Sequence, residues 1–136
     1  MMKRPKFTAQ CCQFLHCEVL EASNGKATTR SAPTKEMENP SGNIQGGILA
    51  GIIDCTFGSA IASLIPDRKK ATIQMTVNYL DTVKAGDKII GTANVIKKGL
   101  TQVYMEAKLE RENDGNLLAK SSTTVILLNS NPNDPS

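Results

Sequence analysis

One long apolar segment, residues 46–64, constrains this chain more than any other feature. It reads GGILAGIIDCTFGSAIASL and carries a single charged residue, Asp54. Its larger apolar residues recur at helical spacing: Ile48, Leu49, Ile52, Ile53, Phe57, Ala60, Ile61 and Leu64. A helix this apolar has to be covered on nearly all sides. We therefore expect a central helix enclosed by the rest of the fold and, where one sheet cannot reach, by a second subunit.

The start of this helix supplies hydrogen-bond donors. A polar loop, NPSGNIQGG, leads into the helix and ends in Gly46 and Gly47. The first N–H groups of a helix have no partner within it, and the helix dipole is positive at that end. Such bare N–H groups suit a developing oxyanion. With Asp54 as a base or nucleophile, they form the minimum set of groups for hydrolysing an activated acyl compound.

Beyond the helix the hydrophobic pattern changes to a period of two, which is typical of strands. Turn sequences such as Asn24-Gly25 and Asn113-Asp114-Gly115 predict hairpins, and successive hairpins make a sheet antiparallel. We expect a bulge at Gly91, and a close approach to the helix at Gly51 and Gly58. The expected strands are residues 16–22, 26–32, 72–79, 88–98, 101–111 and 117–128, with a short turn or helix at 11–16.

Composition narrows the function. The chain has 136 residues, enough for one domain, with 40% hydrophobic and 21% charged residues. Three Phe, two Tyr and no Trp argue against a base-stacking surface, and the scattered cations (net charge +3) form no basic stripe for nucleic acid. The N-terminus lacks an apolar signal segment, and no segment approaches a membrane span. We expect a cytoplasmic protein without nucleic-acid or membrane partners.

The four cysteines give no recognisable metal motif. Cys11, Cys12 and Cys17 lie near the single histidine, His16, but their spacing matches no known zinc site. Cys55 lies in the central helix. We therefore expect free thiols in a reducing compartment and no metal.

Several segments together resemble the hotdog-fold thioesterases. They are the loop NPSGNIQGG, the helix, the strand TIQMTVNYLDTVKAGDKI and the closing strands through VILLN. The most similar branch is the phenylacetate-pathway-like acyl-CoA thioesterases of the 4-hydroxybenzoyl-CoA thioesterase superfamily. The resemblance covers residues 14–128, leaving an N-terminal extension (1–13) and a tail (129–136) that is disordered by composition.

The resemblance implies an α+β hotdog fold, in which one long central helix is wrapped by a curved antiparallel sheet of about five to six strands. It implies a homodimer with sheets joined edge to edge, or a dimer-of-dimers tetramer, with active sites at the dimer interface. Asp54 stands at the position of the catalytic acid, and Gly46 or Gly47 at that of the oxyanion donor. Asn39 would orient water or the thioester, and Thr72 would hold the attacking water.

The resemblance also implies a coenzyme A binding turn, and the sequence departs from the family pattern at Leu100 and Gln45. Lys97, Lys98 and Gly99 lie at the turn that approaches the coenzyme A phosphates, although Leu100 stands where a basic residue often follows. Gln45 replaces the usual histidine before the two glycines. Glutamine can donate a hydrogen bond and fix the helix start, but it cannot change charge near neutral pH.

Two functions follow. The first is hydrolysis of an aryl or medium-to-long acyl-CoA by water, without a metal or any cofactor beyond the coenzyme A of the substrate. The alternative, suggested by Gln45, is an acyl-CoA binding protein of the same fold that does not turn its ligand over. The sequence alone also leaves open that Asp54 and the two lysines are surface charges, that Asn39 and the glycines only form turns, and that Thr72 is an ordinary strand residue.

Overall fold

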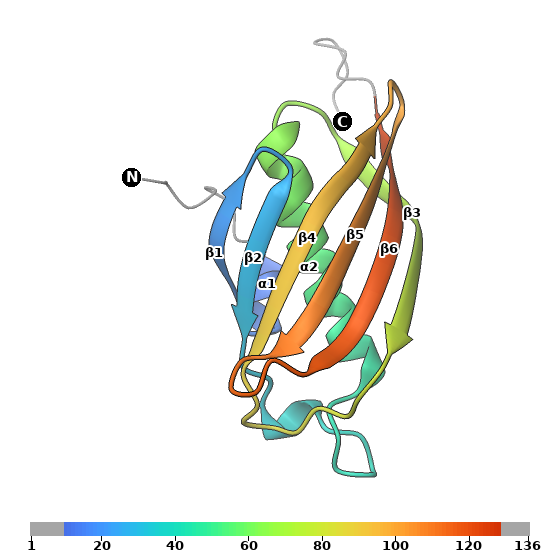
Figure 1. Cartoon of the computed structure of the whole chain (residues 1–136). Coiled ribbons are helices and arrows are strands. Elements are labelled where there is room, and N and C mark those ends of the chain that lie inside the picture. Colours follow the sequence, from blue (N-terminus) through green and yellow to red (C-terminus); the bar gives the residue numbers. More distant parts are fainter. Residues whose placement is uncertain (1–9, 129–136) are drawn as a thin grey trace.

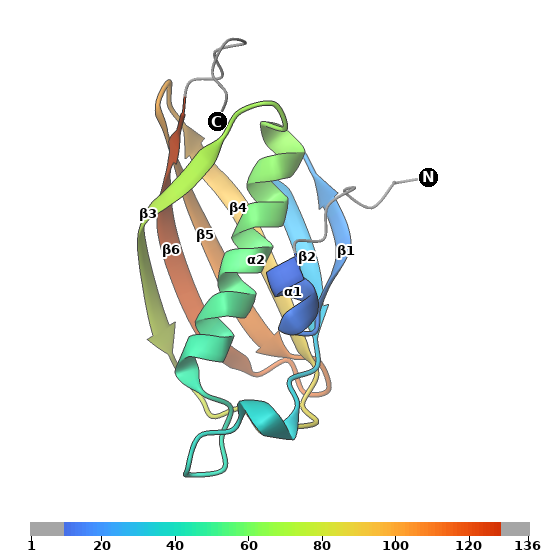
Figure 2. The same cartoon turned by 180° about the vertical axis from the view of Figure 1, so that it is seen from behind.

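A six-stranded antiparallel sheet curves around one side of a long helix, α2 (Figure 1, and from behind Figure 2). The computed structural model describes residues 10–128. Its elements are α1 (Gln10–Phe14), β1 (Cys17–Ser23), β2 (Lys26–Ser31), the 3-10 helix η1 (Lys35–Met37), α2 (Gly46–Leu64), β3 (Lys70–Tyr79), β4 (Ile89–Lys98), β5 (Gln102–Arg111) and β6 (Leu117–Leu127). This architecture confirms the expected fold class.

The strand order is β1-β2-β4-β5-β6-β3, and each neighbouring pair is antiparallel. The chain leaves β2, passes through α2 and enters the sheet again at its opposite edge as β3. All six expected strands and the short N-terminal helix are present, with ends that differ by a few residues. Residues 1–9 and 129–136 lie outside the described residues, so the proposed extension and disordered tail stay predictions.

The core lies between α2 and the concave face of the sheet. The buried apolar residues of α2 are Leu49, Ile52, Ile53, Phe57, Ala60 and Ile61. They meet alternate residues of the strands, as in β5, where Val103, Met105, Ala107 and Leu109 are buried and the residues between them are exposed. The period of two therefore divides the sheet into an apolar inner face and a polar outer face.

Gly91 serves helix packing rather than the bulge that its sequence position suggests. The register shift of the β4–β5 pair lies between Val95 and Lys97, so the expected bulge at Gly91 is wrong. A Cβ at Gly91 would lie 2.6 Å from Thr29 Oγ1 and 3.0 Å from Thr56 Oγ1. These two buried hydroxyls are hydrogen-bonded at 2.9 Å. The glycine leaves space for this polar link between the sheet and α2.

A disulfide joins α1 to α2. Cys12 and Cys55, with Cα atoms 5.9 Å apart, are paired, whereas Cys11 and Cys17 are free thiols. The expectation that all four cysteines are free thiols is therefore wrong for Cys12 and Cys55. A Cβ at Gly51 would lie 2.8 Å from Leu15 Cδ1, so this glycine does permit the close approach that we expected, here by the segment that follows α1.

By length and composition alone, α2 could cross a membrane. The expectation that no segment approaches a membrane span is therefore wrong on that measure. The position of α2 against the sheet, with one side buried, is that of a core helix (Figure 2).

Strand β3 is an exposed edge. Only Lys70, Met75 and Val77 among its ten residues are partly buried, and the others are exposed. Ile73 is 53% exposed, and Leu80, just after the strand, is 54% exposed. β3 pairs with β6 on one side only, so its other side presents unpaired backbone groups, as edge strands do.

Candidate active site

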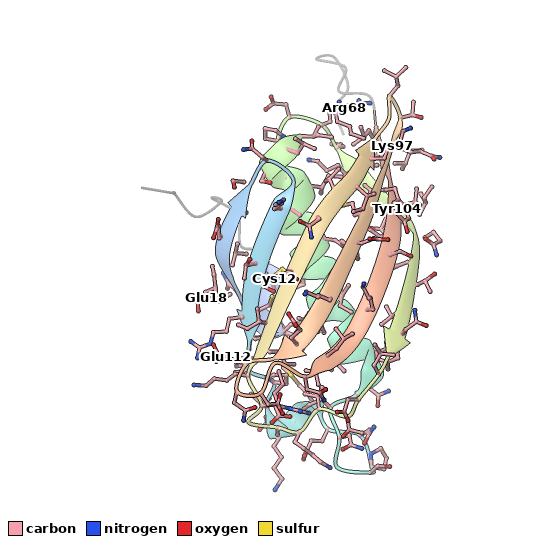
Figure 3. All side chains as sticks on the ribbon, viewed as in Figure 1. Cys12, Glu18, Arg68, Lys97, Tyr104 and Glu112 are labelled. Atoms are coloured by element: carbon pink, nitrogen blue, oxygen red, sulfur yellow. A yellow bond between two sulfur atoms is a disulfide. The ribbon has the colours of Figure 1, made fainter. Side chains whose placement is uncertain are left out.

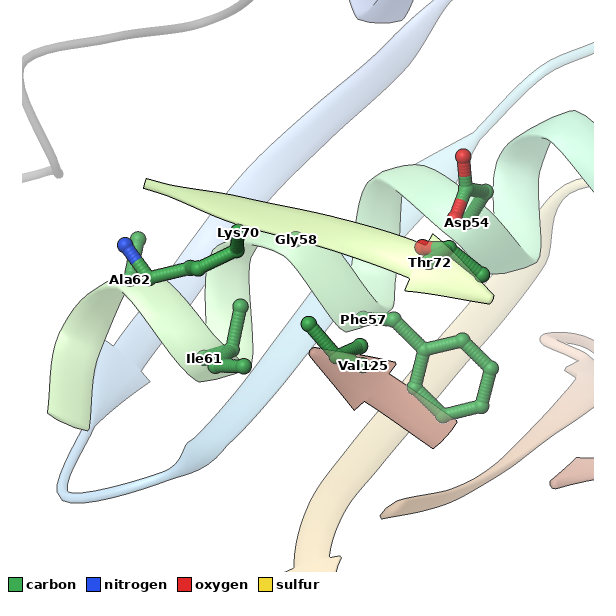
Figure 4. Close-up of a pocket in the computed structure, with 8 residues that line it drawn as sticks. All are labelled: Asp54, Phe57, Gly58, Ile61, Ala62, Lys70, Thr72 and Val125. Atoms are coloured by element: carbon green, nitrogen blue, oxygen red, sulfur yellow. The ribbon is translucent and has the colours of Figure 1, made fainter. Parts of the chain in front are cut away.

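A pocket of about 290 Å³ opens between α2 and the edge strand β3 (Figure 4). Asp54 and Thr72 lie at one end and Lys70 at the other, with Gly58 between them (Figure 4). A Cβ at Gly58 would meet nothing within 4 Å, so within one chain this glycine faces the open space of the pocket, and the expected close approach there stays a prediction. The remaining lining residues are apolar: Phe57, Ile61, Ala62 and Val125.

The carboxylic acid of this site is the side chain of Asp54. The residue is exposed in the single chain, but neighbouring groups remove part of the hydration of its carboxyl. This desolvation raises the pKa of Asp54, and a hydrogen bond from the Thr72 hydroxyl opposes it by stabilising the ionised form. The structure therefore brings two of the predicted residues together, Asp54 and Thr72, from a helix and a strand distant in sequence.

The start of α2 presents free donors. Gln45 occupies the N-cap position, and its side chain makes no capping hydrogen bond. The N–H groups of Gly46 and Gly47 have no acceptor among the described residues. The Tyr79 hydroxyl at the end of β3 donates to the Gly46 carbonyl oxygen at 2.9 Å, which ties the helix start to the edge strand. The predicted oxyanion donors are thus available at an exposed helix end.

Within one chain these donors lie far from the carboxylate. Gly47 and Asp54 are seven positions apart on α2, which is about 10 Å along a helix axis. A single thioester carbonyl is too small to contact both groups at once. One chain alone therefore does not assemble the carboxylate and the donors around one reacting carbon.

Asn39 helps to form the loop before α2. Its Oδ1 accepts hydrogen bonds from the backbone N–H groups of Ser41 at 3.0 Å and Asn43 at 3.1 Å. Gly42 completes the turn with a φ of +81°. Asn39 therefore does stabilise the loop, as one of the two interpretations of the sequence held. Because its Oδ1 is used in this way, only its side-chain NH₂ group is left to contact water or substrate.

The predicted coenzyme A turn lies at the other end of the molecule. Lys97 and Lys98 end β4, and both are exposed. Lys97 lies near Arg68, which follows α2, and so lies at the end opposite the helix start (Figure 3). Within one chain the structure does not bring Lys97, Lys98 and Gly99 together with Gly46 and Gly47.

Comparisons with known proteins agree with this fold. The family model of the thioesterase superfamily matches residues 41–118, which include most of the loop before α2, α2 itself and strands β3 to β5. The chain belongs to the thioesterase superfamily. Acyl-coenzyme A thioesterase 13 of Homo sapiens is 26% identical to it over 111 residues, which cover 82% of this chain and 79% of that protein.

Solved structures show that this thioesterase-superfamily chain shares its fold with known proteins. The Escherichia coli PaaI protein from the phenylacetic acid degradation operon superposes with a TM-score of 0.85 at 20% identity, covering 90% of this chain and 87% of that one. Thioesterase superfamily member 2 of zebra fish has a TM-score of 0.80 at 25% identity, covering 91% and 88%. The predicted family is confirmed, and the roles of individual residues stay predictions.

Sequence reasoning missed one pocket residue of this thioesterase-superfamily chain. Lys70 was counted only among the scattered cations and was not named as a site residue, but it lines the pocket. Its Nζ donates to the Arg68 carbonyl oxygen at 2.7 Å. Burial lowers the pKa of Lys70, and the charge of Asp67 partly opposes this. The signal was available, because residues two apart on a strand share a face and Thr72 was already a candidate.

Proposed function

We propose that this chain hydrolyses acyl-CoA thioesters to a free acid and coenzyme A, as a homodimer or a dimer of dimers. The observation that carries the proposal is the Asp54 carboxyl, with its raised pKa and its Thr72 hydrogen bond, at one end of an apolar pocket. An acyl chain that enters this pocket leaves its thioester carbonyl beside a base. The similarity to acyl-coenzyme A thioesterase 13 supports the choice of coenzyme A thioesters as substrates.

In this mechanism the ionised Asp54 acts as a general base on water. Alternatively it attacks the carbonyl as a nucleophile and expels the coenzyme A thiolate, and water then hydrolyses the resulting anhydride to release the acid. Thr72 orients the carboxylate and offers a hydroxyl oxygen to the attacking water. A positioned base contributes about 10² to 10⁴ in rate. The thioester carbonyl has little resonance stabilisation and the thiolate is a good leaving group, so the mechanism needs no strong acid catalyst and no metal.

The oxyanion donors come from the second chain. We assign this role to the N–H groups of Gly46 and Gly47 of the partner subunit, since the same groups of one chain lie about 10 Å from Asp54. Pairing two copies along β3 would cover its exposed apolar residues and unpaired backbone groups. One donor of this kind is worth about 10² to 10³ in rate.

The test is Asp54→Asn. Loss of the base should lower kcat on acyl-CoA substrates by about 10² or more. Burial raises the pKa of Asp54, so its ionised form destabilises the native state above that pKa; the variant should therefore be at least as stable at neutral pH. Thermal unfolding checks the fold, and Asp67→Asn, an exposed acid outside the pocket, is the matched control. Near-normal activity of Asp54→Asn would remove Asp54 from the mechanism.

A second candidate function is binding of acyl-CoA without turnover. It is favoured by Gln45, which stands at the N-cap with an exposed side chain that makes no capping hydrogen bond. Thiol release measured over a panel of aryl and aliphatic acyl-CoA compounds separates the two functions. Tight binding without release would favour the binding protein.

A further inference from the structure

Lys70 is a partly buried cation at the edge of an apolar pocket. No carboxylate forms an ion pair with it among residues 10–128. Among the described residues its ammonium group makes one hydrogen bond, to the Arg68 carbonyl oxygen, which uses one of its three donors. Asp67 acts on it only at longer range. Two donors and most of the positive charge therefore remain available to a ligand.

The pocket places this charge at a distance from the proposed reacting centre. Thr72 and Lys70 are two residues apart on β3 and share a face, which separates their Cα atoms by about 7 Å. On the other wall, Asp54 and Ala62 are eight positions apart on α2, or about 12 Å along the helix axis. The two ends of the pocket are thus separated by the length of a medium acyl chain (Figure 4).

The chemistry of the two ends differs from that of the walls. Between them the lining is apolar, with Phe57, Ile61 and Val125 available to pack against methylene groups. A hydrocarbon chain that ended against Lys70 would remove water from the ammonium group without replacing its hydrogen bonds, which is costly. A carboxylate at the end of the chain would instead form charge-assisted hydrogen bonds.

We propose that the pocket selects acyl groups that carry a second carboxylate at the end remote from the thioester, with Lys70 as the residue that sets this preference. The substrates would be coenzyme A monothioesters of medium-length dicarboxylic acids. The inference rests on the proposed function, because it takes the acyl chain to enter with its thioester at Asp54. A pocket of about 290 Å³ suits an acyl group better than the bulky phosphate-bearing part of coenzyme A.

The test compares adipoyl-CoA with hexanoyl-CoA, which has the same number of acyl carbons. Wild-type protein should have the higher kcat/KM for adipoyl-CoA. In Lys70→Met the ratio of the two kcat/KM values should fall by about 10- to 100-fold, the value of hydrogen bonds to a charged group. Lys70→Arg should keep most of the preference. Lys69→Met, which removes an exposed neighbouring charge that does not line the pocket, should keep all of it.

A binding measurement separates this inference from the proposed hydrolysis. Calorimetry with non-hydrolysable thioether analogues of both compounds should show the same preference and the same effect of Lys70→Met. Preferential binding of the adipoyl analogue without turnover of either thioester would contradict the hydrolase and support the role of Lys70. Turnover with equal kcat/KM for both thioesters would support the hydrolase and overturn the role of Lys70. Equal weakening of both compounds in Lys70→Met would place Lys70 on coenzyme A, and a failure to bind or hydrolyse either would overturn both proposals.

Discussion

Asp54 differs from two other carboxyl groups, those of Glu36 and Asp114, in the direction in which its pKa is shifted. Glu36, in η1, and Asp114, in the turn between β5 and β6, are exposed and hydrogen-bonded, and their pKa values are lowered. Asp54 lies where α2, β3 and the pocket meet, and loss of hydration raises its pKa. A carboxylate whose ionised form is disfavoured is a stronger base than an ordinary one. The same environment that makes ionised Asp54 unfavourable for stability therefore suits it to proton abstraction.

Thr72 should set the pH at which this base becomes active. The base must be ionised, so kcat/KM should fall as the pH is lowered through the pKa of Asp54, which is above the ordinary value of 3.8. The Thr72 hydrogen bond lowers this pKa, so Thr72→Val should move the acidic limb of the kcat/KM profile to higher pH. Thr76→Val, on the same strand but outside the pocket, is the control. An unmoved limb in Thr72→Val would show that the hydroxyl does not act on the base.

Most helices, strands and turns were predictable from local sequence patterns. The apolar spacing of α2, the alternation of β5 and the Asn24-Gly25 turn each depend on neighbouring residues, and the structure contains all three. Contacts between distant segments were not predictable in this way. The Cys12–Cys55 pair joins residues 43 apart, and nothing local to either cysteine indicates its partner. Thr72 was predicted as a site residue from the family resemblance. The place of Lys70 in the pocket could have been predicted from the strand period but was not.

The Cys12–Cys55 disulfide should contribute to stability by closing a long loop. Such a cross-link typically contributes about 2–4 kcal/mol to the free energy of unfolding, by limiting the unfolded chain. Urea unfolding with and without a reducing agent should show a lower midpoint for the reduced protein. Cys12→Ser should match the reduced wild type and be insensitive to the reducing agent. Cys11→Ser, which leaves the disulfide intact, should behave as the oxidised wild type does, and equal midpoints for oxidised and reduced wild type would contradict the expectation.

For the whole molecule, the separation of its functional groups is the main constraint. The acid lies in the middle of α2, the donors lie at its start, and the pocket opens along the strand at the edge of the sheet. The sequence contained each of these parts, but their separation follows from the length of the helix and the position of β3. In the proposed function, a second copy placed along β3 would supply the donors that the first copy cannot bring to its own carboxylate. Catalysis and assembly are therefore coupled in the proposed function.

This coupling predicts that a charge on the exposed edge abolishes activity without unfolding the chain. Ile73 is 53% exposed on β3, and Ile73→Lys would place an ammonium where the partner strand must pack. Light scattering should show monomers, and thioesterase activity should fall by about 10² or more, because each Asp54 then lacks the oxyanion donors of the partner. Phe14→Lys, which changes a 74% exposed phenylalanine at the end of α1, should leave both the assembly and the activity as they are. Full activity in a monomeric, folded Ile73→Lys would show that one chain is sufficient, and the site would then have to be assembled from donors other than the start of α2.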